Sequence, residues 1–147
     1  MPIAIREAHV VWDGPLTSGA GTISGGSGAF GELPVTWASR IEQPDGKTSP
    51  EELIAAAHAS CFAMALSLVL GEAQTSPERL RVKAECTLDE VEGGPKITGV
   101  ALSLRARVPG VDESSFAGAV DRAAALCPVS NAVRGNVEIK VHSELES

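Results

Sequence analysis

The chain has 147 residues, of which 21% are charged and 44% apolar, and its net charge is -7. A domain of this size can bury a core without disulfides or metals, and this composition is that of a folded protein. The 12 basic residues are scattered and aromatic residues are few, which argues against binding to nucleic acid or to an anionic membrane. Because the N-terminus has no apolar signal core, we expect a cytoplasmic protein in which thiols stay reduced.

The first third of the chain, residues 1–47, is predicted to form short strands. Residues 1–12 alternate apolar and polar side chains, and residues 34–41 form a second apolar run. Between them, residues 13–33 are rich in Gly and Ser, which indicates short strands joined by tight turns.

A long apolar helix is predicted for residues 49–70. Ser49 can cap its first turn, Pro50 fits the first helical position, and Glu52 completes a capping box. From Leu53 to Leu70 the helix is apolar nearly all round, which indicates burial on most sides. The run is too short and too rich in Ala for a confident membrane span, so we expect a curved sheet or a second subunit to cover it.

The second half of the chain predicts a sheet and a further pair of helices. Residues 79–108 alternate as two strands of a hairpin, residues 112–134 form helices, and residues 136–145 form a final strand. The whole is a single α+β domain spanning residues 1–147.

The three cysteines have different settings. Cys86 lies on the apolar face of a strand and is interpreted as a core residue. Cys61 lies about 18 Å along the helix from its positive end, so a reactive thiolate there needs a cation from elsewhere. Cys127 precedes Pro128 at a helix start, where free N–H groups favour a thiolate, and the sequence leaves a reactive thiol and a simple helix joint equally open.

Arg40 is the candidate cation, because it is the only basic residue between Arg6 and Lys47. A carboxylate would hold its guanidinium, and Glu51 is preferred to Glu52 because the capping box uses the latter. Glu51 and Cys61 are about 15 Å apart on a straight helix. They can share one site only if Arg40 spans much of that distance or if Glu51 comes from a second subunit, which favours a homodimer.

The sequence resembles the family of osmotically inducible protein C and organic hydroperoxide reductase, OsmC/Ohr. The resemblance runs through HVVWDG (9–14), TWASRIE (36–42), the segment 48–73, VPGVDESSF (108–116) and CPVSNAV (127–133). It implies an intertwined homodimer in which antiparallel sheets wrap a long buried central helix and a second helix carries the resolving cysteine. It also implies that Cys61 is the peroxidatic thiol and Cys127 the resolving thiol, with Arg40 and Glu51 activating and orienting. The position of Arg40 within TWASRIE looks like the OsmC branch.

The function implied is a thiol-dependent peroxidase that acts in oxidative or osmotic stress. It would reduce organic hydroperoxides, and hydrogen peroxide less well, through a Cys61 sulfenic acid and a Cys61–Cys127 disulfide. No bound cofactor is expected, but an external dithiol must restore the thiols, and the family suggests a lipoyl-type reductant or a lipoylated protein.

Two other functions compete with this interpretation. One is a non-enzymatic redox sensor or a small-ligand binding module on the same fold. The other is a metal site formed by His58, Cys61 and Cys127, although the sequence has no Cys-x-x-Cys pair of the kind that most zinc sites show. His58 is more often a hydrogen-bonded core histidine than a ligand.

Overall fold

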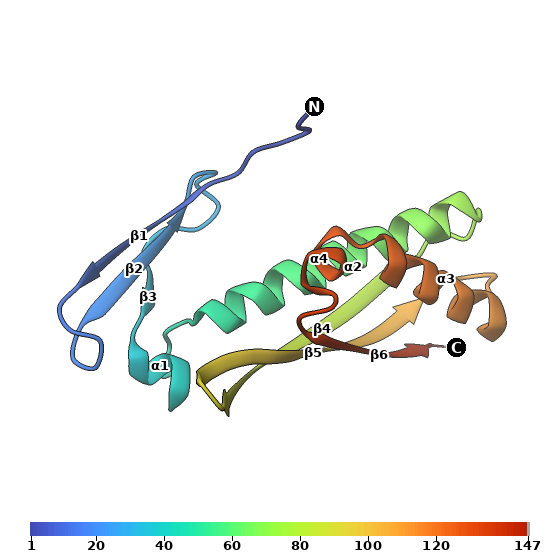
Figure 1. The fold of residues 1–147 in the computed structure, drawn as a ribbon. Helices are drawn as coiled ribbons and strands as arrows, with labels where there is room; N and C mark the ends of the chain where they lie inside the picture. The colour runs from blue at the N-terminus through green and yellow to red at the C-terminus, as the bar shows by residue number, and fades with distance from the viewer. Residues whose placement is uncertain (147) are drawn as a thin grey trace. The chain divides into compact units, whose positions relative to one another are not determined.

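The computed structural model describes residues 1–146, which belong to two compact units, Met1–Leu53 and Ile54–Ser147. Figure 1 shows the elements in chain order. They are β1 (Ala8–Asp13), β2 (Ala20–Gly25), β3 (Leu33–Val35), α1 (Trp37–Ile41), α2 (Pro50–Glu72), β4 (Arg79–Val91), β5 (Gly94–Arg107), α3 (Glu113–Leu126), α4 (Pro128–Val133) and β6 (Glu138–Leu145). The α+β class predicted from the sequence is confirmed.

The N-terminal unit contains a three-stranded antiparallel sheet with the order β1–β2–β3. The first strand begins only at Ala8, so the predicted strand over residues 1–12 is too long. The predicted strand over 34–41 is wrong beyond Val35, because the chain turns there into the short helix α1. Thr36 and Ser39 form a reciprocal capping box, which satisfies the first backbone N–H groups of α1 and favours a helix over an extended chain.

The C-terminal unit contains a three-stranded sheet with the order β4–β5–β6. β4 and β5 form the predicted antiparallel hairpin, with Gly93 (φ 100°) and Gly94 (φ 120°) at its tight turn. β6 lies parallel to β5, so this sheet is mixed, whereas purely antiparallel sheets were expected. A parallel neighbour requires a crossover connection, and α3 and α4 provide it between β5 and β6.

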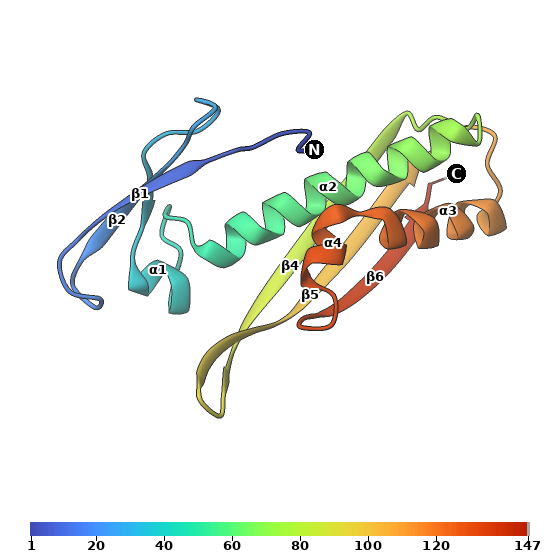
Figure 2. The same ribbon diagram turned by 45° about the horizontal axis from the view of Figure 1, so that its top comes forward.

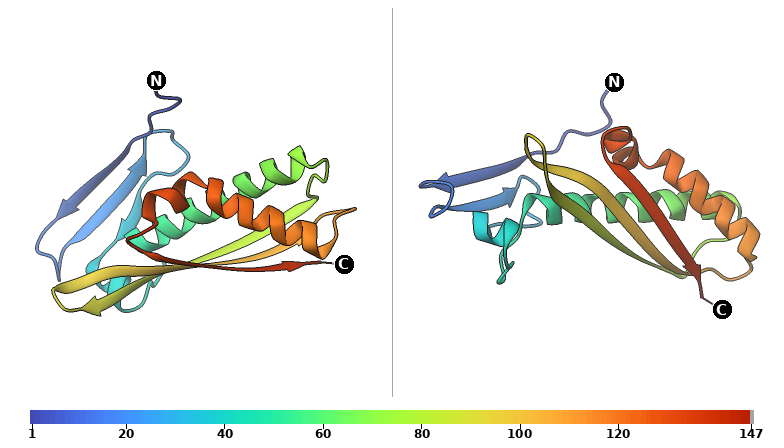
Figure 3. Two further views of the ribbon diagram at one scale, coloured as in Figure 1. Left: turned by 45° about the vertical axis from the view of Figure 1, so that its right-hand side comes forward. Right: turned by 60° about the horizontal axis from the view of Figure 1, so that its bottom comes forward.

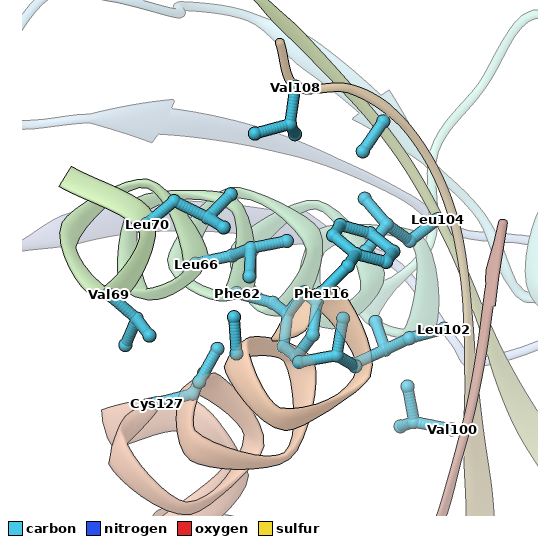
Figure 4. Packing of buried hydrophobic residues seen from close by; sticks show 14 residues of the cluster. Phe62, Leu66, Val69, Leu70, Val100, Leu102, Leu104, Val108, Phe116 and Cys127 are labelled. Carbon is cyan, nitrogen blue, oxygen red and sulfur yellow. The ribbon is translucent and has the colours of Figure 1, made fainter. Parts of the chain in front are cut away.

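Helices α2 and α3 cover one face of the β4–β5–β6 sheet, as Figures 2 and 3 show. The core between them is drawn in Figure 4. It combines one side of α2, the inward residues of β5 and one side of α3, namely Phe62, Leu66, Val69, Leu70, Val100, Leu102, Leu104, Ala106, Phe116, Ala119, Val120 and Ala123. Cys86 packs against this core from β4, which confirms its interpretation as a core residue.

Within the unit Ile54–Ser147, one side of the apolar helix α2 packs against the core. Phe62 and Leu66 are fully buried, whereas Met64 is 69% exposed and Leu68 57% exposed. The unit Ile54–Ser147 by itself therefore does not bury α2 on most sides, although the sequence had indicated such burial. By length and composition alone, α2 is long and apolar enough to cross a membrane, so the sequence argument that it is too short is wrong. The core helix of a protein without membrane spans can meet the same criterion.

Candidate functional site

Arg40 is held on α1 by a set of short polar contacts. The Ser39 hydroxyl donates to the Thr48 carbonyl oxygen over 2.8 Å, and Thr36 and Ser39 cap the first turn of the helix. Arg40 follows in the last turn, with its guanidinium carbon 5.9 Å from the centre of the Trp37 ring. This ring contact and the adjoining carboxylate described next fix the direction of the guanidinium group.

The partner of Arg40 is Glu51, as the sequence predicted. Arg40 Nε donates to both carboxylate oxygens of Glu51, at 2.7 Å and 3.2 Å, and Glu51 is only 7% exposed. Glu52 instead accepts a hydrogen bond from the Thr48 hydroxyl. Both members of this ion pair come from one chain.

Cys61 and Cys127 are the second pair that the structure brings together. Cys61 lies in the middle of α2 and is half-buried, while Cys127 is fully buried at the N-cap of α4. No disulfide joins them in this structure, and the two thiols are near enough for each to shift the pKa of the other. Disulfide formation requires two thiols whose sulfur atoms can approach each other, and Cys61 and Cys127 meet this requirement.

The two thiols have opposite pKa shifts. Burial raises the pKa of Cys61, and the hydrogen bond with Cys127 raises it further, against a backbone hydrogen bond from Val129. Burial also acts to raise the pKa of Cys127, but the hydrogen bonds from Ser130, with those from Cys61 and Val129, bring it below its ordinary value. Within its own unit, Cys127 therefore holds the negative charge more readily than Cys61.

The lowered pKa of Cys127 has a clear structural origin at the start of α4. The backbone N–H of Ser130 donates to Cys127 Sγ over 3.5 Å, in the position of an N-cap contact. The sequence correctly placed this sulfur at a helix start, but it assigned no role to Ser130. The three-residue spacing between an N-cap residue and its N–H donor is the signal that identifies Ser130.

His58 is a buried core histidine, as expected, and it contacts Ser130. His58 Nε2 lies 2.7 Å from Ser130 Oγ, and burial lowers the pKa of His58. Residues 1–146 contain no group of three His, Cys, Asp or Glu side chains that could hold a metal ion. The geometry therefore does not support a site built from His58, Cys61 and Cys127.

The predicted site residues thus form two pairs that belong to different units of the chain. Arg40 and Glu51 lie within Met1–Leu53, and Cys61 and Cys127 lie within Ile54–Ser147. One pair offers a cation held by a carboxylate, and the other offers two adjacent thiols. These are the kinds of side chain that a thiol-based redox enzyme uses.

The family and its relatives agree with this chemistry. The family described as OsmC-like protein matches residues 43–142, and the chain belongs to that family. Peroxiredoxin OsmC of Escherichia coli (strain K12) is 44% identical over 133 residues, which cover 90% of this chain and 91% of that protein. An organic hydroperoxide resistance protein of Xanthomonas axonopodis pv. citri is 36% identical over 95 residues, which cover 63% of each chain.

The fold matches solved structures over its whole length. The structure of an organic hydroperoxide resistance protein OsmC from Legionella pneumophila has a TM-score of 0.74 at 26% identity and covers 100% of both chains. The structure of OhrB, an organic hydroperoxide resistance protein of Bacillus subtilis, has a TM-score of 0.71 at 26% identity and covers 94% of this chain. These matches confirm the fold class inferred from the resemblance.

Proposed function

We propose that this chain reduces organic hydroperoxides with Cys61 as the peroxidatic thiol and Cys127 as the resolving thiol. Its class is that of a hydroperoxide-detoxifying peroxidase, consistent with relatives named as a peroxiredoxin and as organic hydroperoxide resistance proteins. The observation that carries the two-thiol mechanism is the proximity of Cys61 and Cys127, which pack in the same core and shift each other's pKa. Neither thiol has to travel far to form a disulfide with the other.

The reaction follows from this geometry in three steps. The Cys61 thiolate attacks one peroxide oxygen, the O–O bond breaks, and the alkoxide takes a proton to leave as the alcohol. Cys61 is then a sulfenic acid, which Cys127 attacks. The S–O bond breaks, hydroxide takes a proton to leave as water, and the disulfide forms. An external dithiol reduces that disulfide and restores both thiols.

Arg40 supplies the positive charge that the Cys61 thiolate needs. Burial raises the pKa of Cys61, so its thiolate needs a positive charge to stabilise it. The guanidinium of Arg40 uses Nε for Glu51, and its terminal amino groups have no hydrogen-bond partner among residues 1–146. They are the donors for a thiolate and for the departing alkoxide oxygen. Glu51 keeps the guanidinium oriented.

The active form is a homodimer of this chain. All six residues of β1 are exposed, including Val10 and Val11 at 60% and 63%, and Met64 and Leu68 are exposed on α2. A soluble protein rarely leaves apolar residues of this size uncovered on two separate surfaces, and a small N-terminal unit gains little from its own core. A second copy of the chain covers both surfaces.

The substrate class follows from the residues beside Cys61. Ile54, Met64 and Ala65 on α2 are apolar and reach the surface in part, whereas Phe62 is fully buried and belongs to the core. Apolar walls bind the alkyl group of an organic hydroperoxide and give hydrogen peroxide no such contact. We therefore expect a higher kcat/KM for cumene hydroperoxide, and equal values for the two peroxides would contradict this preference.

The reductant is a small dithiol of the lipoyl type or a lipoylated protein, and the compartment is the cytoplasm. A dithiol suits the reaction because it reduces a disulfide by two successive exchanges and closes its own ring. Turnover with reduced lipoamide but little turnover with glutathione at equal thiol concentration would support this choice. The reverse order would contradict it.

The decisive experiment compares wild type with Cys61→Ser, Cys127→Ser and the matched control Cys86→Ser. Peroxide turnover with a dithiol is measured, and the mass of each protein is determined by mass spectrometry after reaction with one equivalent of peroxide. Cys61→Ser should be inactive, Cys127→Ser should stop as a sulfenic or over-oxidised species, and Cys86→Ser should behave as wild type. Turnover by Cys61→Ser would move the attacking role to Cys127, whose pKa is the lower of the two.

The same experiment tests the non-enzymatic alternative. A redox sensor or a binding module would form the Cys61–Cys127 disulfide once and would show no multiple turnover with any dithiol. Multiple turnover by wild type excludes that function.

A further inference from the structure

His58 and Ser130 form a buried polar pair that the proposed reaction does not yet use. The two residues are 72 positions apart in the sequence, and their exposed fractions are 0% and 1%. His58 Nε2 lies 2.7 Å from Ser130 Oγ. Burial of polar groups next to an apolar core is costly unless they are hydrogen-bonded, so this pair requires a physical reason.

Ser130 also contacts the sulfur of Cys127. Its backbone N–H donates to Cys127 Sγ over 3.5 Å, and its hydroxyl is near enough to the same sulfur to lower the pKa of the Cys127 thiol. The Ser130 oxygen is thus shared between the imidazole of His58 and the thiol of Cys127. A hydroxyl has a single proton, so it can donate to only one of these two neighbours at a time.

The other ring nitrogen of His58 decides the direction of the proton. Burial lowers the pKa of His58, so the imidazole is neutral near pH 7 and carries one N–H. Within residues 1–146, His58 Nδ1 is buried without a hydrogen-bond partner. Buried N–H groups without an acceptor are rarer than acceptors without a donor, which favours the proton on Nε2. His58 then donates to Ser130 Oγ, and the hydroxyl proton of Ser130 is left to point at the sulfur.

We infer that His58 is a positioning residue for Cys127, because its Nε2–H turns the Ser130 hydroxyl toward the sulfur and so stabilises the Cys127 thiolate. This inference rests on the proposed role of Cys127 as the resolving thiol. In that step the thiolate attacks the Cys61 sulfenic sulfur, the S–O bond breaks, and hydroxide takes a proton to leave as water. His58 acts only through Ser130 and itself neither gains nor loses a proton.

The groups around Cys127 determine how far the Ser130 hydroxyl can control the pKa of its thiol. The causes acting on its thiol come from burial, Ser130, Cys61 and Val129, and they include no charged side chain. Cys127 belongs to the buried apolar cluster that also contains residues of β5 and α3. Cys61 is a titratable group that acts on the Cys127 thiol directly, and the experiment removes it.

The test titrates Cys127 as the only thiol, in a chain that also carries Cys61→Ser and Cys86→Ser. The ultraviolet absorbance of the thiolate is followed against pH for His58→Leu, His58→Gln, Ser130→Ala and Ser130→Thr. His58→Leu and Ser130→Ala should each raise the midpoint by about one pH unit, which is about a tenfold loss of thiolate below the midpoint. His58→Gln and Ser130→Thr keep the donor groups and should stay near the parent value. The double variant His58→Leu/Ser130→Ala should shift no further than Ser130→Ala alone.

An unchanged midpoint in a folded His58→Leu protein, with folding checked by circular dichroism, would overturn the inference. If His58→Leu does not fold, an unchanged midpoint in Ser130→Ala has the same consequence. Because the titration uses no peroxide, its failure leaves the proposed peroxidase function intact, and failure of turnover leaves the titration valid.

A kinetic measurement separates positioning from a general structural effect. In the chain with all three cysteines, His58→Leu should slow disulfide formation about tenfold after one equivalent of peroxide and leave the rate of sulfenic acid formation unchanged. Equal slowing of both steps would overturn the assignment, since a structural defect would affect both.

Discussion

The buried ion pair between Arg40 and Glu51 predicts an unequal response to removal of its two partners. Glu51 is 7% exposed and receives two contacts from Arg40 Nε, at 2.7 Å and 3.2 Å, whereas the side chain of Arg40 is 31% exposed. Arg40→Met leaves a buried carboxylate without a partner. Glu51→Gln leaves a guanidinium that water can reach, and it keeps an amide oxygen that accepts from Nε.

The magnitudes follow from this difference in exposure. Removal of one partner from a fully buried pair costs about 3–5 kcal/mol, and the exposure of Arg40 brings the expected cost of Arg40→Met to about 2–3 kcal/mol. Glu51→Gln should cost about 1 kcal/mol, the net value of one hydrogen bond. The double variant should cost less than the sum of the single variants by about 1–2 kcal/mol, because its second change removes the stranded charge.

The free energies of unfolding are measured by urea denaturation, at one protein concentration because a dimer is expected. Circular dichroism is the preferred signal, since Trp37 contacts Arg40 and its fluorescence would report the local change. Additive costs, or a larger cost for Glu51→Gln than for Arg40→Met, would refute the reasoning. Peroxide turnover should fall in all three variants.

Three further results are expected. Phe62→Ala removes a fully buried ring from the core and should lower the free energy of unfolding by about 3–5 kcal/mol in urea denaturation, and a cost below about 1 kcal/mol would contradict its place in the core. Met64→Glu and Leu68→Glu place charges on the exposed apolar side of α2 and should shift sedimentation toward the monomer; an unchanged dimer mass would mean that the dimer uses another surface. Since the pKa of His58 is lowered in the folded state, the unfolded chain binds more protons below about pH 6.5, so stability should decline as pH falls from 7.5 to 5.5. Thermal melting should show a flatter decline in His58→Gln than in the exposed control His142→Gln, and equal slopes would remove His58 as the cause.

Local sequence patterns determined much of the fold and of the candidate site. The alternation over 79–108 predicted the hairpin of β4 and β5, because each side chain of a strand faces opposite to the next. The Ser49-Pro50 start predicted the beginning of α2, and Pro128 predicted Cys127 as the N-cap of α4. The choice of Glu51 over Glu52 as the partner of Arg40 was correct, although the Glu52 carboxylate accepts from the Thr48 hydroxyl and not, as the predicted capping box required, from the Ser49 backbone N–H.

Contacts between distant residues were decided only by the tertiary structure. The bond from Ser39 to the Thr48 carbonyl helps to hold a helix at Arg40 where the apolar pattern indicated a strand. The direction of β6 depends on the crossover through α3 and α4, and the link between His58 and Ser130 joins residues that no periodic pattern relates. A helix that is apolar all round has no preferred side, so the sequence identified α2 as buried, whereas packing against β5 and α3 determined which side the single chain covers.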